Sequence, residues 1–447
     1  MWTDPLLSEW AFACDGTLIG GDAVVTTIST DTRTLSDGDI YVALVGEFFN
    51  GHFYVNTAIH KNASAIVVEV EQTDCPVPQL VVDDSKRALG VLAGILRNRF
   101  QGQVVALTGS VGKTSTRAML ENIFSLQPGL LATVGNFNND IGVPKTWFRI
   151  NERHQRILLE FGANAQKEIE WLCEFSKPQI SLLLNAGKAH TEGFGGIEGV
   201  RQGKGEIIEG TVAEGGCVLN QDDPAFNYWL KRAGDRKVVS FGKRTDADVC
   251  LLAFKNTGQG SEFTLGMPDG DISVAWSMLG MHMALNATAA AATAWLAGVS
   301  ELDIAQGLSE MKPEPGRMEP VESLHGGPLI HDAYNANPES FAAAIDVLAD
   351  LGDDTLLIAG DMAELGETSE QNHRDVGLYA RGKIKSIWSV GKHSEYISQA
   401  FDGHHFDSIS DLLAVLPTKL ENETAVLVKG SRSSGMERVV DALRRKL

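Results

Sequence analysis

Short runs of apolar residues recur along the chain, and most of them precede a glycine or polar turn and then a helical pattern. The clearest runs lie at 104–107, 157–159, 180–184, 218–219, 329–331, 355–359, 386–390 and 425–428. Strands covered on both faces need apolar side chains throughout, so these runs predict buried strands. Strands that alternate with helices are typical of an α/β fold with doubly wound parallel sheets.

Two proline-containing segments interrupt this pattern and predict where domains meet. Residues 75–78 lie near the end of a first unit, and residues 312–316, which carry two prolines and a glycine, predict an interdomain hinge. A chain of 447 residues is too long for one ordinary core. We therefore expect three α/β domains, at 1–83, 84–312 and 313–447.

Composition and charge narrow the choice of partners. With 43% hydrophobic and 21% charged residues, the composition is that of a soluble globular protein. The formal net charge of −20 argues against nucleic acid or an anionic membrane as a partner. Small anionic ligands remain compatible, because local lysines and helix N-termini can hold them. We expect a monomer that binds small molecules.

Targeting features also favour the cytoplasm. The N-terminus lacks the basic and long apolar segments of a signal peptide. The Ala-rich helical stretch around 283–298 is interrupted by Asn286, Thr288 and Thr293, which is typical of a core helix and not of a membrane span. The cysteines form no C-x-x-C pair, which indicates reduced thiols and neither a disulfide frame nor a zinc site; they are Cys14, Cys75, Cys173, Cys217 and Cys250.

A phosphate-binding loop is the strongest motif. Residues 108–115 read Thr-Gly-Ser-Val-Gly-Lys-Thr-Ser and directly follow an apolar run. The two glycines let backbone N–H groups approach anionic oxygens, Lys113 supplies a positive charge, and the hydroxyl of Thr114 can bind Mg²⁺. The preceding strand and following helix make an accidental Gly-Lys-Thr a poor explanation. The loop is shorter than the usual G-x-x-x-x-G-K-[ST] form, since Leu107 stands where the first glycine would be.

Polar residues end the strands next to this loop. Glu160 ends one predicted strand, Asn185 ends the next, and His190 follows five residues later. Carboxyl ends of parallel strands meet at one edge, so these side chains should converge on Lys113 and Thr114. An isolated histidine is more often structural, but a loop position beside an ATP cradle favours a ligand. A carboxylate, an imidazole and a loop hydroxyl suit two magnesium ions that bridge ATP phosphates.

Two other groups of residues have an ordinary structural explanation beside a functional one. Lys204 lies in Gly-Lys-Gly-Glu-Ile-Ile, and the pattern alone is that of a solvated helix lysine. Asn136, Asn138 and Asn139 lie in a tight polar loop, where turn chemistry and ligand contact are about equally compatible with the pattern.

The last domain carries a polar strand end at residues 331–338. Asn337 suits a helix N-cap and Pro338 the first helical position, which accounts for both without a ligand. Capping does not explain Asp332. An acidic residue at the end of a strand resembles the acid that bonds a nucleotide ribose in such sheets. The loops 360–366 and 429–433 close other strands of the same sheet, and they are compatible with a second-substrate pocket or with plain turns.

Together these motifs resemble the Mur ligase family, ATP-dependent amide ligases that build the peptidoglycan stem peptide. The resemblance rests on the short phosphate loop, the Glu160 and His190 strand ends, the Lys204 helix and the Asp-Ala-Tyr-Asn-Ala-Asn-Pro segment from Asp332, and it covers nearly the whole chain. That last segment, with Gly-Asp-Met-x-Glu-Leu-Gly at 360–366, is most similar to members that join D-alanyl-D-alanine to UDP-N-acetylmuramoyl-tripeptide. Residues 29–33 and 46–53 resemble a uridine-binding N-terminal domain.

The resemblance implies a P-loop central domain, a Rossmann-like C-terminal domain that closes over ATP, and a reaction through an acyl phosphate that yields ADP and phosphate. It makes Lys113, Glu160, His190 and Lys204 catalytic, with Lys204 carbamylated by carbon dioxide. Two Mg²⁺ ions would be held by Thr114, Glu160, His190 and the Lys204 carbamate. Gly203 replaces the alanine that is common before this lysine.

The remaining implied roles concern the three substrates. ATP would contact Gly109, Ser110, Gly112, Lys113, Thr114, Ser115, Asn286 (adenine), Arg317 (phosphates) and Asp332 (ribose). The UDP-substrate would contact Thr32, Arg33, Asn136 and Asn138, and the dipeptide Tyr334, Asn335 and Asn337.

Two other functions would fit part of this pattern. A sibling ligase could add a different residue, but the diamino-acid motif Asp-Asn-Pro-Arg is missing, and the uridine-type N-terminal segments argue against a folate substrate. A binding or scaffold protein could use ATP only to change shape. The combination of Glu160, His190 and Lys204 favours an enzyme, because such a switch does not need the second metal site.

Overall fold

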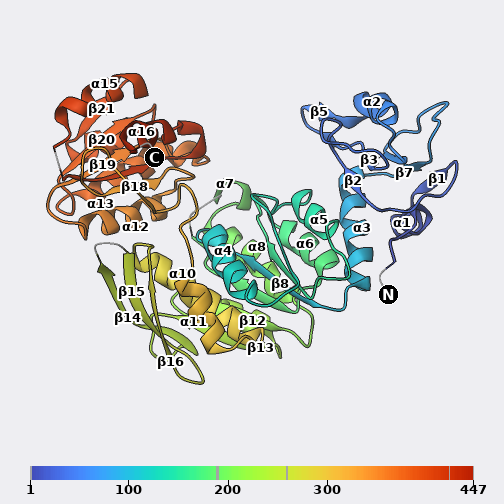
Figure 1. The fold of residues 1–447 in the computed structure, drawn as a ribbon, viewed down its shortest axis with the longest axis horizontal. Coiled ribbons are helices and arrows are strands. Elements are labelled where there is room, and N and C mark those ends of the chain that lie inside the picture. The colour runs from blue at the N-terminus through green and yellow to red at the C-terminus, as the bar shows by residue number, and fades with distance from the viewer. Residues whose placement is uncertain (1–2, 188–190, 258–259, 422, 446–447) are drawn as a thin grey trace.

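The computed structural model describes residues 3–187, 191–257, 260–421 and 423–445. Three large sheets, each covered by helices, follow one another along the chain, and a two-stranded sheet of β4 and β5 lies in the first domain (Figure 1). The N-terminal and C-terminal sheets lie at opposite ends of the molecule, with the largest sheet between them (Figure 1). The predicted three-domain α/β fold is confirmed, while the boundaries at 83/84 and 312/313 stay predictions.

The N-terminal domain is built on a five-stranded sheet of order β1-β7-β6-β3-β2, in which only β1 runs antiparallel to its neighbour. Its elements are α1 (Leu7–Ala13), β1 (Thr17–Ile19), β2 (Ile28–Ser29), β3 (Ile40–Val42), β4 (Val45–Gly46), β5 (Phe49–Asn50), the 3-10 helix η1 (Gly51–Tyr54), α2 (Val55–His60), β6 (Ala65–Val68) and β7 (Gln79–Val81). Every residue of β6 is buried, as a central strand with two covered faces requires.

The central domain contains a nine-stranded sheet of order β16-β15-β14-β13-β12-β11-β8-β10-β9. Its elements are α3 (Ser85–Arg99), β8 (Gln103–Thr108), α4 (Lys113–Phe124), β9 (Leu130–Ala132), α5 (Gly142–Trp147), β10 (Arg156–Glu160), α6 (Glu168–Ser176), β11 (Ile180–Leu183), α7 (Thr191–Phe194), α8 (Ile197–Glu209), β12 (Gly216–Asn220), α9 (Phe226–Ala233), β13 (Lys237–Gly242), β14 (Val249–Thr257), β15 (Gly260–Gly266), β16 (Asp271–Trp276), α10 (Met281–Leu296) and α11 (Glu301–Ser309).

The parallel part of this sheet, β9 to β14, contains the predicted central strands. Strands β15 and β16 extend it in antiparallel fashion, which the sequence did not predict. Residues of β16 alternate between exposed and buried, so this strand presents one face to solvent and lacks a continuous apolar run.

The Ala-rich stretch forms α10 and packs in the central core, as predicted. Its buried hydroxyls are satisfied within the helix, because Thr288 donates to the Ala284 carbonyl and Thr293 to that of Ala289. Across the described residues, no helix is both long and apolar enough to span a membrane.

The C-terminal domain has a six-stranded sheet of order β17-β18-β22-β19-β20-β21, parallel except for the edge strand β17. Its elements are β17 (Glu319–Val321), β18 (Leu329–Asp332), α12 (Pro338–Ala349), β19 (Thr355–Ala359), η2 (Gly366–Thr368), α13 (Ser369–Ala380), β20 (Ser386–Val390), α14 (Glu395–Phe401), β21 (His404–Phe406), α15 (Ile409–Lys419), β22 (Ala425–Lys429), η3 (Arg432–Ser434) and α16 (Glu437–Leu443). The four runs predicted after the hinge are β18, β19, β20 and β22.

Helix α3 belongs to two cores at once. It begins at the Asp84 cap, whose side chain accepts a hydrogen bond from the Arg87 N–H. Leu89 and Leu92 contribute to the N-terminal core, whereas Ala93 and Leu96 contribute to the central core. Figure 1 shows the helix between the two sheets.

The central and C-terminal domains also touch beyond the hinge. Leu279, just before α10, packs in the C-terminal core, and the Asn256 amide donates to the Asp350 carboxylate at 2.7 Å. After α11 the chain passes through the prolines of 312–316 and turns at Gly316, where φ is +74°. The central and C-terminal domains are therefore in contact, and the segment that joins them has a backbone suited to a hinge.

Candidate active site

The phosphate loop joins β8 to α4 at the carboxyl edge of the central sheet. Gly112 caps α4 with φ of +84°, a conformation that favours glycine. The Asn185 side chain, at the end of neighbouring β11, accepts hydrogen bonds from the Ser110 and Val111 N–H groups, both at 3.0 Å. The loop is thus held from the next strand, with the helix N-terminus available to an anion.

Lys113 lies within this loop. Its Nζ donates to the Gly109 carbonyl at 2.6 Å and to the Ser110 carbonyl at 3.3 Å. Burial lowers the pKa of Lys113, the charge of Glu160 opposes this shift, and the charge of Arg317 adds to it. The strand-end carboxylate contacts the loop directly, because the Thr114 hydroxyl donates to Glu160.

Glu160 is the centre of the polar cluster. It is 1% exposed, and its Oε1 accepts from the Thr114 hydroxyl at 3.2 Å and from the Asn138 amide at 3.0 Å. Its Oε2 is buried without a hydrogen bond, and the Nε of Arg117 lies 3.4 Å away. A buried carboxylate oxygen without a hydrogen-bond partner, beside a loop hydroxyl, fits the donor chemistry of Mg²⁺.

Lys204 lies on α8 and is not a solvated helix lysine. It is 1% exposed, and its Nζ donates to the Ala163 carbonyl at 3.0 Å. Burial lowers the pKa of Lys204 well below its ordinary value, and the charge of Lys113 lowers it further. A neutral amine is the form that can capture carbon dioxide, so the surroundings of Lys204 suit carbamylation.

Three glycines allow the turn α7 to pack closely on this region. An added Cβ would overlap the Asn164 carbonyl at Gly193, the Phe194 carbonyl at Gly199, and the Phe194 ring at Gly203. The buried ring of Phe194 lies 5.1 Å from the Lys204 Nζ. Glycine in place of the usual alanine at 203 therefore makes room for the aromatic ring that covers the lysine.

Gly203→Ala is expected to lower the free energy of unfolding by about 1–3 kcal/mol, because its methyl group must displace the Phe194 ring. Denaturant unfolding of the variant measures this. In a Phe194→Ala background the same substitution should cost much less, and equal costs in the two backgrounds would show that the two residues are not coupled.

Three other predicted ATP contacts lie in different elements around the loop or in the third domain. The Asn286 side chain, on α10, approaches Gly112 so closely that an added Cβ would meet its Oδ1 at 2.6 Å. Arg317 lies over the Tyr334 ring at 4.4 Å. Ser115 is buried in the first turn of α4. The roles of these residues toward adenine and phosphates stay predictions.

Asp332 is held by its own domain. Its Oδ2 is 2.6 Å from the Nζ of Lys429, a lysine that is 1% exposed, and its Oδ1 accepts from the Met318 N–H at 3.1 Å. Lys429 also donates to the Asn335 carbonyl at 3.1 Å. The predicted ribose contact would therefore use a carboxylate whose position is already set by a buried lysine.

The three residues predicted to bind the dipeptide have different surroundings. Asn337 caps α12 and forms a capping box with Ser340, as its sequence position indicates. The Asn335 side chain accepts from the Ala336 N–H. The Tyr334 ring lies beside two charged groups, the guanidinium groups of Arg317 and Arg432.

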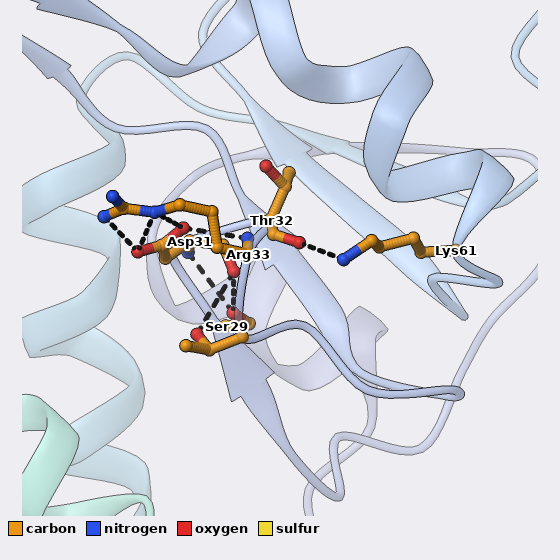
Figure 2. A network of polar contacts seen from close by, with 6 residues as sticks. Ser29, Asp31, Thr32, Arg33 and Lys61 are labelled. Carbon is orange, nitrogen blue, oxygen red and sulfur yellow. Dashed lines mark hydrogen bonds and ion pairs between the residues drawn. The ribbon is translucent and has the colours of Figure 1, made fainter.

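Two of the four residues predicted to contact the UDP-substrate, Thr32 and Arg33, lie in the N-terminal domain, and the other two, Asn136 and Asn138, lie in the central domain. Figure 2 shows the Arg33 guanidinium paired with the Asp31 carboxylate, at 2.7 Å for the shortest contact, and the Thr32 carbonyl accepting from Lys61 at 2.7 Å. Hydrogen bonds from Arg33 lower the pKa of Asp31 to about 2. Asn136 is exposed, whereas the Asn138 side chain donates to Glu160, and the Asn138 N–H donates to the Asn136 carbonyl at 2.8 Å. Their contact with the UDP-substrate stays a prediction.

Sequence reasoning missed Arg117 and the pairing of Lys429. Arg117 lies inside α4 and contacts Glu160, Glu121 and, at 3.8 Å, Glu314 of the hinge segment. A helix-interior arginine has no motif to mark it. His190 lies outside the described residues, and the described part of the chain holds no group of three or more His, Cys, Asp or Glu side chains suited to a metal.

Comparison with known proteins agrees with this fold. Residues 107–294 match the Mur ligase middle domain, and residues 316–432 match the Mur ligase, glutamate ligase domain. The chain belongs to the Mur ligase family. It is 39% identical to the UDP-N-acetylmuramoyl-tripeptide–D-alanyl-D-alanine ligase of Escherichia coli K12, over 98% of both chains.

Solved structures agree with this relationship over nearly the full length. MurF from Acinetobacter baumannii is 32% identical with a TM-score of 0.91, over 98% of both chains. MurF ligase from Thermotoga maritima, in complex with ADP, is 27% identical with a TM-score of 0.85, over 94% of this chain and 97% of that one.

Proposed function

We infer that this chain is an ATP-dependent ligase that joins D-alanyl-D-alanine to UDP-N-acetylmuramoyl-tripeptide in peptidoglycan synthesis. The full-length similarity to ligases with this name supports the substrates. The observation that carries the chemistry is the convergence of Lys113, Thr114 and buried Glu160 at one edge of the sheet. The amine of Lys204, whose pKa is lowered by burial, belongs to the same region. The chain has the parts for phosphoryl transfer to a carboxylate.

The reaction has two steps. The terminal carboxylate of the tripeptide attacks the γ-phosphorus of ATP, which releases ADP and leaves an acyl phosphate. The free amine of the dipeptide then attacks the acyl carbon, and phosphate leaves as the amide forms and the amine loses its proton. Phosphoryl transfer between anions is mainly a problem of position and charge. Lys113 and the loop N–H groups hold the phosphates, and Arg317 adds positive charge from the third domain.

The same proposal includes two Mg²⁺ ions and a carbamate on Lys204. Thr114, Glu160 and the carbamate would hold the ions together with His190, which lies outside the described residues. Bound Mg²⁺ supplies charge neutralisation between the carboxylate and the γ-phosphate. The buried Glu160 Oε2 without a hydrogen bond and the lowered pKa of Lys204 support this donor set.

The proposed boundaries, 1–83, 84–312 and 313–447, assign the uridine nucleotide to the first domain, ATP to the second, and the dipeptide and closure to the third. A cytoplasmic location is part of the proposal, and the five free cysteines are compatible with it. A monomer remains our expectation.

Closure of the third domain over ATP is a further part of the proposal, since an acyl phosphate hydrolyses if water reaches it. We expect a non-hydrolysable ATP analogue together with the UDP-tripeptide to reduce the radius of gyration in small-angle X-ray scattering. Gly316, with its positive φ, lies where the chain would bend. An unchanged radius with both ligands bound would contradict closure.

Phosphate release tests the function directly, with ATP, Mg²⁺ and UDP-N-acetylmuramoyl-tripeptide, and D-alanyl-D-alanine or single amino acids as second substrate. Release only with the dipeptide, with a product of the expected mass, is the expected result. Release with a diamino acid on a dipeptide precursor would assign the chain to a sibling activity. Release that does not depend on an amine would defeat the mechanism.

A further inference from the structure

Two arginines of the C-terminal domain lie around one aromatic ring. The guanidinium carbon of Arg317 is 4.4 Å from the centre of the Tyr334 ring, and that of Arg432 is 5.7 Å from it. Tyr334 follows β18 and Arg432 follows β22, and these two strands are adjacent and parallel, with Asp332 opposite Lys429. Both arginines therefore stand at the carboxyl edge of the sheet, where ligands of open α/β domains bind.

The two arginines differ in what they face. Arg317 faces the phosphate-loop helix: its N–H donates to the Glu314 carbonyl, and the Glu314 carboxylate lies 3.8 Å from Arg117 of α4. Its charge also lowers the pKa of Lys113. Arg432 is exposed, and within the part of the chain that the structure describes no ion pair joins it to a carboxylate. It is a cation on the substrate side of the domain without an anion of its own.

Two other cationic residues of this region are already paired. Lys429 is buried against Asp332, and Arg117 contacts Glu160, Glu121 and Glu314. Arg432 is therefore the exposed cation that stands beside Tyr334, where β18 and β22 end.

The substrates reach the site from opposite ends. Figure 1 places the N-terminal domain, the proposed holder of the uridine nucleotide, on the far side of the central domain from the C-terminal sheet. In the proposed function the attacking amine is brought by the third domain. In an extended dipeptide the amine and the terminal carboxylate are about 7 Å apart, so the carboxylate lies well away from the γ-phosphate.

We infer that Arg432 binds the terminal carboxylate of the dipeptide. The Tyr334 ring positions the Arg432 guanidinium and separates it from Arg317, which faces the phosphates. This inference rests on the proposed function and names the recognition group of its second substrate. A guanidinium forms two parallel hydrogen bonds with a carboxylate, which fixes the direction of the dipeptide as well as its affinity. The amine is thereby directed toward the acyl phosphate.

The test compares D-alanyl-D-alanine with its C-terminal amide, which lacks the negative charge, in the wild type and in Arg432→Ala, Arg432→Gln and Arg438→Ala. Arg438 is an exposed arginine on α16, six residues away, and serves as the matched control. We expect Arg432→Ala and Arg432→Gln to raise KM for the dipeptide on the order of tenfold to a hundredfold. KM for the amide should change little, so the preference of the wild type for the acid should largely disappear.

The same kinetic measurements distinguish this inference from other roles of Arg432. KM values for ATP and for the UDP-tripeptide should stay within about twofold of wild type, and Arg438→Ala should resemble wild type throughout. A preserved preference for the acid in both Arg432 variants, with circular dichroism showing them folded, would overturn the inference. A raised KM for ATP or for the tripeptide instead would assign Arg432 to another anion. Failure of the wild type to use the dipeptide at all would refute the proposed function and not this assignment alone.

Discussion

Replacement of Lys113 by alanine is expected to lower kcat for phosphate release by at least about a hundredfold, because the loop loses its positive charge beside the transferred phosphate. The dissociation constant of the UDP-tripeptide should change by less than about threefold, since the uridine-type residues Thr32 and Arg33 lie in another domain. Steady-state phosphate release and isothermal calorimetry measure the two quantities.

Lys231→Ala is a suitable control for this prediction, because Lys231 is an exposed lysine at the end of α9. It should leave both quantities unchanged. A parallel loss of catalysis and of UDP-substrate binding in Lys113→Ala would contradict the separation of the two sites.

Lys204→Ala is expected to raise the activation barrier by about 2–4 kcal/mol, which is a loss of roughly thirtyfold to a thousandfold in kcat. The carbamate on this lysine is proposed to hold Mg²⁺, and alanine cannot form it. In ¹³C-bicarbonate, the wild type should show a carbamate carbonyl resonance by ¹³C NMR, and the variant should not.

Truncation of a buried lysine also leaves a cavity, so Lys204→Met is the informative companion. Methionine fills a similar volume without an amine. Loss of activity in both variants, with melting temperatures of Lys204→Met near wild type, is the expected result. Near-wild-type turnover of Lys204→Met would show that the lysine acts only through packing.

Much of the parallel core could be predicted, because buried strands must be apolar on both faces and this leaves a continuous run in the sequence. β8, β10, β11 and β22 are of this kind. The antiparallel extension β15–β16 and the two-residue strands of the N-terminal domain leave no such run. β16 alternates between exposed and buried residues, and a two-residue strand is too short to show any period.

The site divides in a similar way. Lys113, Thr114 and Glu160 were predictable, because a loop motif and a strand end specify a place in a parallel sheet. Burial of Lys204 was not predictable from its helix, since it depends on the packing of Phe194 against Gly203. The pairing of Asp332 with Lys429 joins residues 97 positions apart, and no local pattern reports such a contact.

Helix α3 limits how the chain can be divided. Because its side chains complete two cores, a fragment that ends at residue 83 would lose Leu89 and Leu92 from the N-terminal core. A fragment that ends at 99 would keep them but expose Ala93 and Leu96 to water. The N-terminal domain therefore cannot be exchanged between relatives by joining the chains in the loop before α3. A working chimera must take α3 together with the surface of the central domain on which it rests.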